Sequence, residues 1–354
     1  MRTIGPEQLD DLALGTAVLG TGGGGDPHIG KLTAAAAMRP HGPVRLIALD
    51  DLGDDDLVVP AAMMDAPTVM LEKLPRGDEI VNAFTGLQAY LGRTVTAVAP
   101  IDAGGLNSTT PFIVAATPGV PLMDADGMGR AFPELQMVTP TLHGLAATPM
   151  AIGGEKGNSA IINTCDNVWT ERIARTITIQ MGGVAFVALY PMSGAQARAS
   201  LVPGTVSLAL QLGAAIREAR RSKRSPIDAV LAIAGGRRLF GGKIVDVRRR
   251  TERGFARGEA AIRGTGEDEG HDLQIRFQNE NLIALRDGVP VATVPDLITV
   301  LDAESGAPIT TETLRYGFRV AVIGMPCAAA WREAAGLALV GPRTFGCDME
   351  YRPL

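Results

Sequence analysis

Asp124 and Asp126 are the two side chains whose types and spacing best suit acid–base chemistry. They lie in the segment MDADGMGRAFPELQM and follow the apolar run at 121–123, which predicts a strand. Residues two apart on a strand face the same side, and open α/β sheets bind ligands at the carboxyl ends of their strands. Both carboxylates can therefore converge on one point, and we predict that they are catalytic.

Arg130 and Glu134 follow this acidic pair. Gly127 and Gly129 predict a turn that leads into a helix with Arg130 and Glu134 in its first turns. At a spacing of four residues the two side chains can form an ion pair on one helix face. The other interpretation is that Arg130 binds substrate.

A run of four glycines, Gly22–Gly25, stands between two stretches that predict helices. Glycine in regular structure costs roughly 0.5–1 kcal/mol, so the run must serve a purpose. Gly20, Gly22 and Gly25 fit the GxGxxG spacing of a phosphate-binding loop. However, such a loop follows a strand, and the preceding stretch 6–19 predicts a helix. Three interpretations stay open: a phosphate cradle, a structural turn, and a loop whose backbone approaches a substrate.

The residues after the glycines add to the third interpretation. Asp26 and Pro27 suit the cap and the first turn of the next helix, and His28 follows directly. A carboxylate and an imidazole would then stand beside exposed backbone N–H groups. We predict that Gly23 and Gly24 approach the substrate and that Asp26 and His28 take part in the acid–base chemistry.

A divalent metal such as zinc is a further expectation, because imidazole and carboxylate groups from separate loops can form a zinc-type site. The candidate ligands are His28, Asp124 and His143, which lies in the turn-like stretch PTLHG. Their spacing does not match the HExxH pattern of zinc hydrolases, so this prediction rests on residue type alone. No organic cofactor is predicted.

Helix-like and strand-like stretches alternate through the first half of the chain. Helices are predicted at 6–19, 78–92 and 107–117, and strands at 44–49, 57–64 and 94–100. Such alternation predicts a mainly parallel sheet with helices over it.

The second half changes character. Helices predicted near 166–181 and 203–220 flank an apolar strand, and from about residue 235 short β-like runs are separated by Gly, Pro, Asp and Asn. We predict the α/β fold class, with a β-rich, barrel-like C-terminal domain. The expected divisions are an α/β domain with the glycine-rich loop at 1–165, a connecting region that packs on it at 166–234, and the β-rich domain at 235–354.

Composition and charge limit the class of protein. Of the 354 residues 46% are hydrophobic, yet no apolar run is long enough for a membrane span, and the N-terminus lacks the pattern of a signal peptide. Three widely spaced cysteines fit reduced thiols in a cytoplasm. The first 164 residues carry a net charge of −9 and the rest +4, but the basic stretches lack interleaved aromatic residues. We expect a cytoplasmic homo-oligomer that acts on a small molecule and binds neither nucleic acid nor membrane.

Four separated segments, in this order, resemble one bacterial family. They are LGTGGGGDPHIGKL, APTVMLEKLPRGDE, MDADGMGRAFPELQM and FQNENLIA. Together they make the whole chain similar to the S-methyl-thiohydantoin desulfurase family, some relatives of which are fused to hydantoinase/oxoprolinase domains. The resemblance implies a two-domain protein that removes sulfur from a thiohydantoin ring, and it allows a hydantoinase as a partner.

The second of these segments contains Glu72 and Lys73, a charged pair after an apolar run. The pair can clamp a substrate or simply be a solvated strand end. Asn107 and Ser108 stand at a predicted helix entry, where they can bind a carboxylate or a ring carbonyl, or cap the helix.

Three residues of the fourth segment, Asn279, Glu280 and Asn281, can orient a flat, amide-like ring, although such residues are also ordinary in turns. The predicted reaction is hydrolytic: water attacks the thio-substituted ring carbon with acid and base help from Asp and His. Two alternatives remain, a nucleotide- or phosphate-binding module and a non-catalytic partner of a hydantoinase/oxoprolinase.

Overall fold

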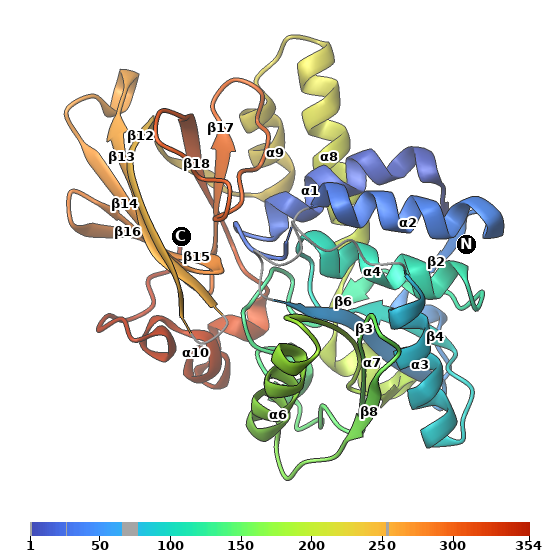
Figure 1. Cartoon of the computed structure of the whole chain (residues 1–354). Helices are drawn as coiled ribbons and strands as arrows, with labels where there is room; N and C mark the ends of the chain where they lie inside the picture. The colour runs from blue at the N-terminus through green and yellow to red at the C-terminus, as the bar shows by residue number, and fades with distance from the viewer. Residues whose placement is uncertain (1, 26, 66–76, 253–254) are drawn as a thin grey trace.

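The computed structural model describes residues 2–25, 27–65, 77–252 and 255–354. Two large sheets, one two-stranded sheet and ten α-helices lie in this part of the chain. Figure 1 shows how they are arranged. The helices are α1 (Leu9–Leu19), α2 (Pro27–His41), α3 (Asp78–Leu91), α4 (Gly105–Ala116), α5 (Thr139–Leu142), α6 (Asn167–Gln180), α7 (Gly194–Ser200), α8 (Thr205–Arg221), α9 (Pro226–Ala234) and α10 (Ala334–Val340). None of the described helices is long and apolar enough to cross a membrane.

The first sheet has nine strands and mixed directions. Its main order is β1-β2-β5-β4-β3-β9-β7-β8, and β10 pairs with β3. The four neighbours β2, β5, β4 and β3 are parallel, whereas the other pairings are antiparallel. The strands are β1 (Arg2–Ile4), β2 (Val44–Ile47), β3 (Leu57–Asp65), β4 (Ala97–Pro100), β5 (Leu122–Met123), β7 (Met150–Gly153), β8 (Ser159–Ile162), β9 (Val184–Ala188) and β10 (Met192–Ser193). The predicted α/β class is confirmed. The sequence predicted a mainly parallel sheet, whereas the sheet is mixed, with three parallel pairings among the eight described.

Helices from both halves of the chain pack around the first sheet. Helix α4 contacts β3 and β4, α6 contacts β3 and β9, and α8 packs along α1. Two glycines allow α1 and α8 to approach closely. A Cβ on Gly15 would lie 1.7 Å from the carbonyl oxygen of Ala209, and a Cβ on Gly213 would lie 1.8 Å from the carbonyl oxygen of Asp11. Residues 166–234 thus add β9 and α8 to the N-terminal layers.

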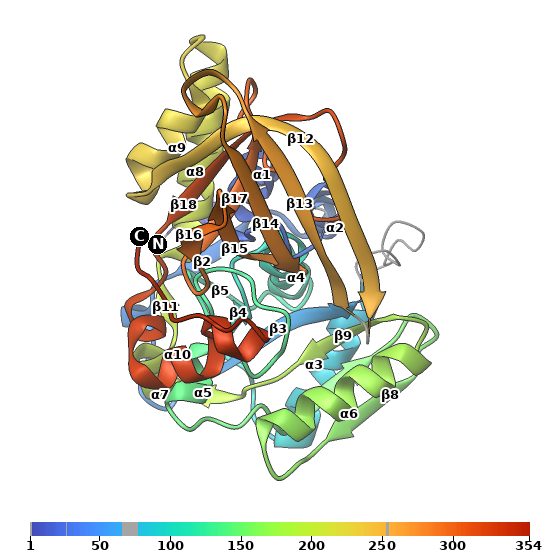
Figure 2. The same ribbon diagram turned by 90° about the vertical axis from the view of Figure 1, so that its left-hand side faces the viewer.

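The second sheet is antiparallel, has seven strands, and curls into a half-barrel (Figure 2). Its order is β16-β15-β14-β13-β12-β18-β17, and Asn281 Nδ2 on β15 donates to the Ile298 carbonyl of β17 at 3.0 Å. A separate apolar core involving this sheet includes Phe240, Ile262 and Val322. The prediction of a β-rich, barrel-like C-terminal part is confirmed. The strands are β12 (Arg237–Glu252), β13 (Phe255–Gly264), β14 (Asp272–Gln278), β15 (Glu280–Arg286), β16 (Val289–Thr293), β17 (Leu297–Asp302) and β18 (Arg319–Met325).

Short elements complete the chain. A two-residue pairing joins β6 (Ala125–Asp126) to β11 (Val202–Pro203). The 3-10 helices are η1 (Pro6–Gln8), η2 (Leu49–Asp51), η3 (Gly266–Asp268), η4 (Ala329–Arg332) and η5 (Pro342–Phe345).

The helix predicted to carry Arg130 and Glu134 does not form, and residues 127–137 are irregular. The cause is local. The carboxylate of Asp126 accepts hydrogen bonds from the backbone N–H groups of Met128 and Gly129, and Gly129 adopts a left-handed φ of 68°. Side-chain acceptors of this kind compete with helical hydrogen bonding and favour a turn.

Candidate active site

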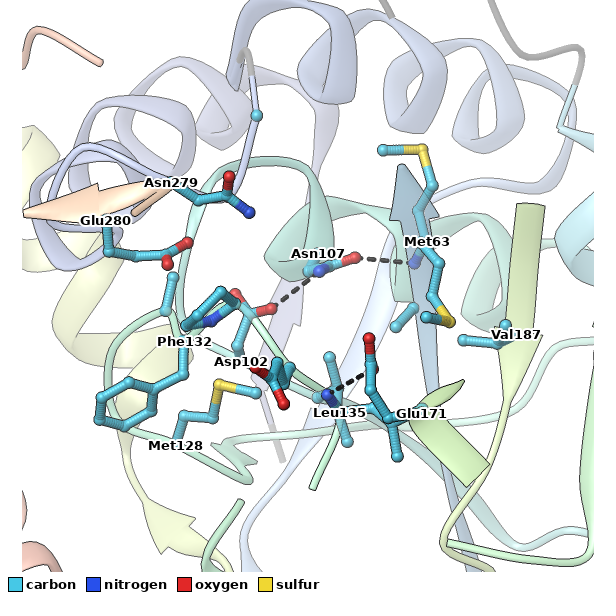
Figure 3. A pocket seen from close by; sticks show the side chains of 18 of the residues that line it. Met63, Asp102, Asn107, Met128, Phe132, Leu135, Glu171, Val187, Asn279 and Glu280 are labelled. Carbon is cyan, nitrogen blue, oxygen red and sulfur yellow. Dashed lines mark hydrogen bonds between the residues drawn. The ribbon is translucent and has the colours of Figure 1, made fainter. Parts of the chain in front are cut away.

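A cavity lies where the two sheets meet, and residues from both halves of the chain line it (Figure 3). The N-terminal half contributes the glycine loop, the β4–α4 turn and the irregular segment 128–135. The C-terminal half contributes α6, β9 and the turn between β14 and β15. Among the described residues, four carboxyl groups line the cavity, those of Asp102, Glu134, Glu171 and Glu280.

Asp102 follows β4, at the carboxyl edge of the parallel strands, and its side chain is fixed from two sides. Its Oδ1 accepts from the Gly104 N–H at 2.7 Å, and its Oδ2 accepts from Asn107 Nδ2 at 2.8 Å. The Asn107 Oδ1 in turn accepts from the Met63 N–H of β3 at 2.7 Å. These contacts hold the Asp102 side chain at the entry of α4.

Glu280 is the first residue of β15 and faces the cavity from the opposite side (Figure 3). Its side chain is buried, and its Oε2 has no hydrogen-bond partner among the described residues. Burial raises the pKa of Glu280 well above its ordinary value, and the charge of Asp102 adds to this rise, whereas the Arg130 guanidinium opposes it. A carboxyl group with a raised pKa keeps its proton to higher pH than an ordinary glutamate does, and it can donate that proton.

Arg130 is fully buried beside Glu280 and joins three parts of the molecule. Its Nη1 donates to the carbonyls of Pro295 and Asp296 at 2.7 and 2.9 Å, and its Nη2 donates to Thr21 Oγ1 at 3.0 Å. Burial lowers its pKa to about 10, which leaves the guanidinium charged at neutral pH. The residue does not line the cavity, so it connects the glycine loop to the β-rich half and places a positive charge behind Glu280.

The glycine loop packs tightly against its neighbours. A Cβ on Gly23 would lie 2.1 Å from Glu280 Oε1, and one on Gly24 would lie 2.7 Å from the Gly104 carbonyl carbon. The Leu106 N–H donates to the Gly24 carbonyl at 2.7 Å, and Gly22, Gly24 and Gly25 have positive φ. Helix α1, not a strand, precedes the loop, so it lacks the context of a dinucleotide-binding loop.

The wall formed by α6 carries a buried ion pair. Glu171 Oε2 accepts from the Leu135 N–H at 3.0 Å, and its Oε1 pairs with Arg175. Tyr190 supports the same wall, because its hydroxyl donates to the Leu135 carbonyl at 3.3 Å. Arg175 also lies 4.5 Å from the ring centroid of Phe255, so its position is set by contacts on both sides.

Apolar side chains form much of the remaining surface. They are Met63, Met128, Phe132 and Val187, and Figure 3 shows them around the polar groups. Phe132 packs edge-on against Trp331, with ring centroids 5.2 Å apart. The cavity therefore offers apolar faces together with carboxyl and amide groups, which suits a small, flat, polar ring.

Asp124 and Asp126, the predicted catalytic pair, are not among the residues that line the cavity. Their side chains make hydrogen bonds to nearby backbone and side-chain groups instead. Asp124 accepts from the Ser207 N–H at 2.9 Å and from Ser207 Oγ at 2.6 Å, so it binds the first turn of α8. Asp126 holds the turn described above, and burial raises its pKa to about 6. The two carboxylates thus bind different parts of the chain: Asp124 binds α8, and Asp126 binds the turn at 128–129.

The predicted zinc ligands lie apart. His28 is exposed on α2, His143 is exposed at the end of α5, and Asp124 contacts α8. Over the described ranges, no three His, Cys, Asp or Glu side chains are close enough together to hold a metal ion.

The predicted substrate-binding residues divide into two groups. Gly24, Asn107 and Asn279 line the cavity. Others support its surroundings: Gly23 touches Glu280, Ser108 Oγ donates to the Asp102 carbonyl, and Asn281 links β15 to β17. Asp26, Glu72 and Lys73 fall outside the described residues.

Sequence reasoning did not single out Asp102, Glu171 or Arg175, and it gave Glu280 a part in orienting the ring but no role as an acid. A signal for Asp102 was present, since it follows a predicted strand and precedes a glycine-rich helix entry. Glu280 stands between the two asparagines that were singled out. Glu171 and Arg175 lie on a helix that looks ordinary in sequence, and no local pattern marks them.

Comparisons with known proteins agree with this architecture. The family described as "S-Me-THD-like, N-terminal domain" matches residues 7–164, and "S-Me-THD-like, C-terminal domain" matches residues 165–354. A crystal structure of a protein from Chromobacterium violaceum superposes with a TM-score of 0.84, at 27% identity and with all of both chains covered. No curated protein matches the chain. The resemblance carried by the four sequence segments is confirmed, and the chain belongs to the S-Me-THD-like family.

Proposed function

We propose that this chain hydrolytically removes sulfur from a thiohydantoin or S-methyl-thiohydantoin ring bound in the cavity between the two sheets. Membership of the S-Me-THD-like family supports a desulfurase role. The observation that carries the mechanism is the pair of buried carboxyl groups, Asp102 and Glu280, whose environments favour opposite protonation states. Two such groups on one cavity supply a base and an acid.

Asp102 is the proposed base, because backbone and amide N–H donors stabilise its charged form. As water oxygen bonds to the thio-substituted ring carbon, Asp102 accepts one water proton. The electron pair of the ring C=N bond moves to the nitrogen, which then takes up that proton. The result is a tetrahedral carbon that carries a hydroxyl group and the S-methyl group.

Glu280 is the proposed acid, because burial raises the pKa of its carboxyl and so favours the protonated form. When the ring carbonyl forms, the C–S bond breaks and Glu280 gives its proton to the departing sulfur. The hydroxyl proton restores the acid. In sum, water and the S-methyl ring give a hydantoin and methanethiol. A thione substrate, which reacts as its thiol tautomer with a ring C=N bond, gives hydrogen sulfide by the same steps.

Substrate orientation falls to amide groups and apolar faces. Asn279 Oδ1 is held by the Ala256 N–H at 2.8 Å, which directs its amide from the β14–β15 turn toward the cavity (Figure 3). A ring carbonyl can accept from that amide, while Met63 and Phe132 contact the ring faces. Fixing a flat ring next to both carboxyl groups lowers the entropic cost of the reaction.

The test is turnover of a simple S-methyl-thiohydantoin in ¹⁸O-labelled water. We expect methanethiol release and one ¹⁸O atom in the product carbonyl. Asp102→Asn should lower kcat roughly 10²–10⁴-fold, whereas Asp272→Asn, an exposed carboxylate on β14 paired with Arg263, should leave kcat unchanged. Absence of methanethiol, or its release without the label, would overturn the proposal.

A further inference from the structure

A second cavity lies on the C-terminal half, and arginines dominate its lining. It is bounded by β12, β13 and β14, which run side by side in Figure 2, and by residues of the C-terminal segment. Arg248, Arg250, Arg257 and Arg276 line it, and Glu259 is the one carboxylate among the described lining residues. Nothing in the proposed reaction uses these side chains.

Strand register places the arginines on one face. Arg250 lies directly opposite Arg257 across the β12–β13 ladder, and Arg257 lies opposite Gln278 on β14. Arg276, two residues before Gln278, therefore projects to the same face. Side chains directly opposite in a sheet have Cβ atoms about 4.5–5.5 Å apart, so the Arg250 and Arg257 charges repel each other.

The available carboxylates do not neutralise the whole group. Arg248 pairs with Asp246 at 2.9 Å and lies 3.6 Å from Glu259, and Arg250 pairs with Glu252 at 3.3 Å. In the part of the chain that the structure describes, the guanidinium groups of Arg257 and Arg276 have no hydrogen-bond or ion-pair partner. Two unpaired guanidinium groups on neighbouring strands form a fork that suits adjacent anionic groups.

We propose that this cavity binds a small molecule that carries two adjacent anionic groups, of the diphosphate type. A bridging anion would relieve the repulsion between Arg250 and Arg257 while pairing with Arg257 and Arg276. Leu282 and Phe345 line the same cavity and give an apolar side for an organic part of the ligand. The site is separate from the desulfurisation cavity, although Gln278 in its lining immediately precedes Asn279 and Glu280.

Titration calorimetry with inorganic pyrophosphate at low ionic strength tests the proposal. We expect one saturable site, with affinity at least tenfold higher than for orthophosphate. The double substitution Arg257→Gln/Arg276→Gln should weaken pyrophosphate at least tenfold. The matched control is Arg263→Gln on β13, whose side chain lies 3.7 Å from Asp272 and outside the cavity, and it should bind as the wild type does.

Melting temperatures with and without pyrophosphate distinguish a role of Arg257 in anion binding from a role in holding the fold. Without anion, Arg257→Gln should keep or raise the melting temperature, because it removes a like-charge pair, and it should abolish the rise that pyrophosphate gives the wild type. Any of three results would overturn the proposal. They are equal affinities for pyrophosphate and orthophosphate, an equal loss of pyrophosphate affinity in the double variant and in the control, and no binding of pyrophosphate. Tighter binding of a short single-stranded oligonucleotide than of pyrophosphate would also overturn it, in favour of a nucleic-acid surface.

Discussion

Gly23 and Glu280 are in direct contact: a Cβ on Gly23 would lie 2.1 Å from the Oε1 atom of Glu280. This contact connects the glycine run, the most conspicuous feature of the sequence, to the buried carboxyl on the far half of the chain. The glycines allow the loop backbone to lie where any side chain would displace that carboxyl. The arrangement accounts for part of the run by close packing.

Gly23→Ala should therefore lower kcat at least tenfold, because the methyl group must move the Glu280 carboxyl. Gly23 does not have a positive φ, so backbone strain does not contribute. The matched control is Gly86→Ala on α3, where a Cβ meets nothing within 4 Å, and it should leave kcat unchanged and add up to about 1 kcal/mol of stability. Wild-type kcat in Gly23→Ala would show that the carboxyl position is unimportant.

Asp124→Asn tests the interpretation that sequence alone favoured. Since Asp124 binds the first turn of α8, we expect kcat within a few-fold of wild type. Asp124→Ala should lower the free energy of unfolding by about 1 kcal/mol through loss of that contact. Steady-state kinetics and urea denaturation measure the two quantities. A loss of several orders of magnitude in kcat, in a folded Asp124→Asn protein, would restore the catalytic interpretation.

Asp126 predicts a pH dependence of stability. Burial raises its pKa from 3.8 to about 6, so the folded state binds a proton more tightly than the unfolded state does. The stabilisation that this tighter proton binding gives the folded state is complete below pH 3.8, and it is lost as pH rises through about 6. At about 1.4 kcal/mol for each pKa unit, the loss is on the order of 3 kcal/mol.

Urea denaturation of the wild type and of Asp126→Asn across this pH range measures the effect. The difference in unfolding free energy between the two proteins should change by about 3 kcal/mol between pH 3.5 and pH 7, in favour of the variant at the higher pH. A difference that stays constant with pH would show that Asp126 does not titrate as described.

Metal removal distinguishes a mechanism based on the two carboxyl groups from one that uses a zinc ion, which the residue types suggested. With Asp102 as base and Glu280 as acid, dialysis against a chelator should leave the rate of methanethiol release unchanged. Metal analysis of the dialysed protein provides the control for removal. Loss of activity that zinc restores would mean that a metal ion activates the water.

Much of the fold could be predicted, because its signals are local. The helical periodicity at 78–92 and the apolar run at 57–64 correspond to α3 and β3. The contacts of Arg130 could not be predicted, because its partners Thr21 and Pro295 lie 109 and 165 residues away in the sequence. Only the packing of the two sheets brings them together.

In the candidate site, too, local signals could be predicted from the sequence, whereas contacts between distant segments could not. The strand-end rule that selected Asp124 applies equally to Asp102, and only the structure shows which carboxylate faces a cavity and which binds α8. Asn107 and Asn279 could be selected by residue type. The high pKa of Glu280 depends on burial by a glycine loop more than 250 residues earlier in the chain, which no local pattern reveals.

Methanethiol release by Glu280→Gln tests whether Glu280 is the acid of a hydrolytic desulfurisation. The amide keeps the shape of the side chain but has no proton to give to sulfur. We predict a kcat roughly 10²–10⁴-fold below wild type. We also expect the wild-type kcat to fall as pH rises through the raised pKa of Glu280, and the kcat of the variant to lack this fall. A folded Glu280→Gln protein with wild-type kcat and the wild-type pH profile would show that Glu280 is not the acid.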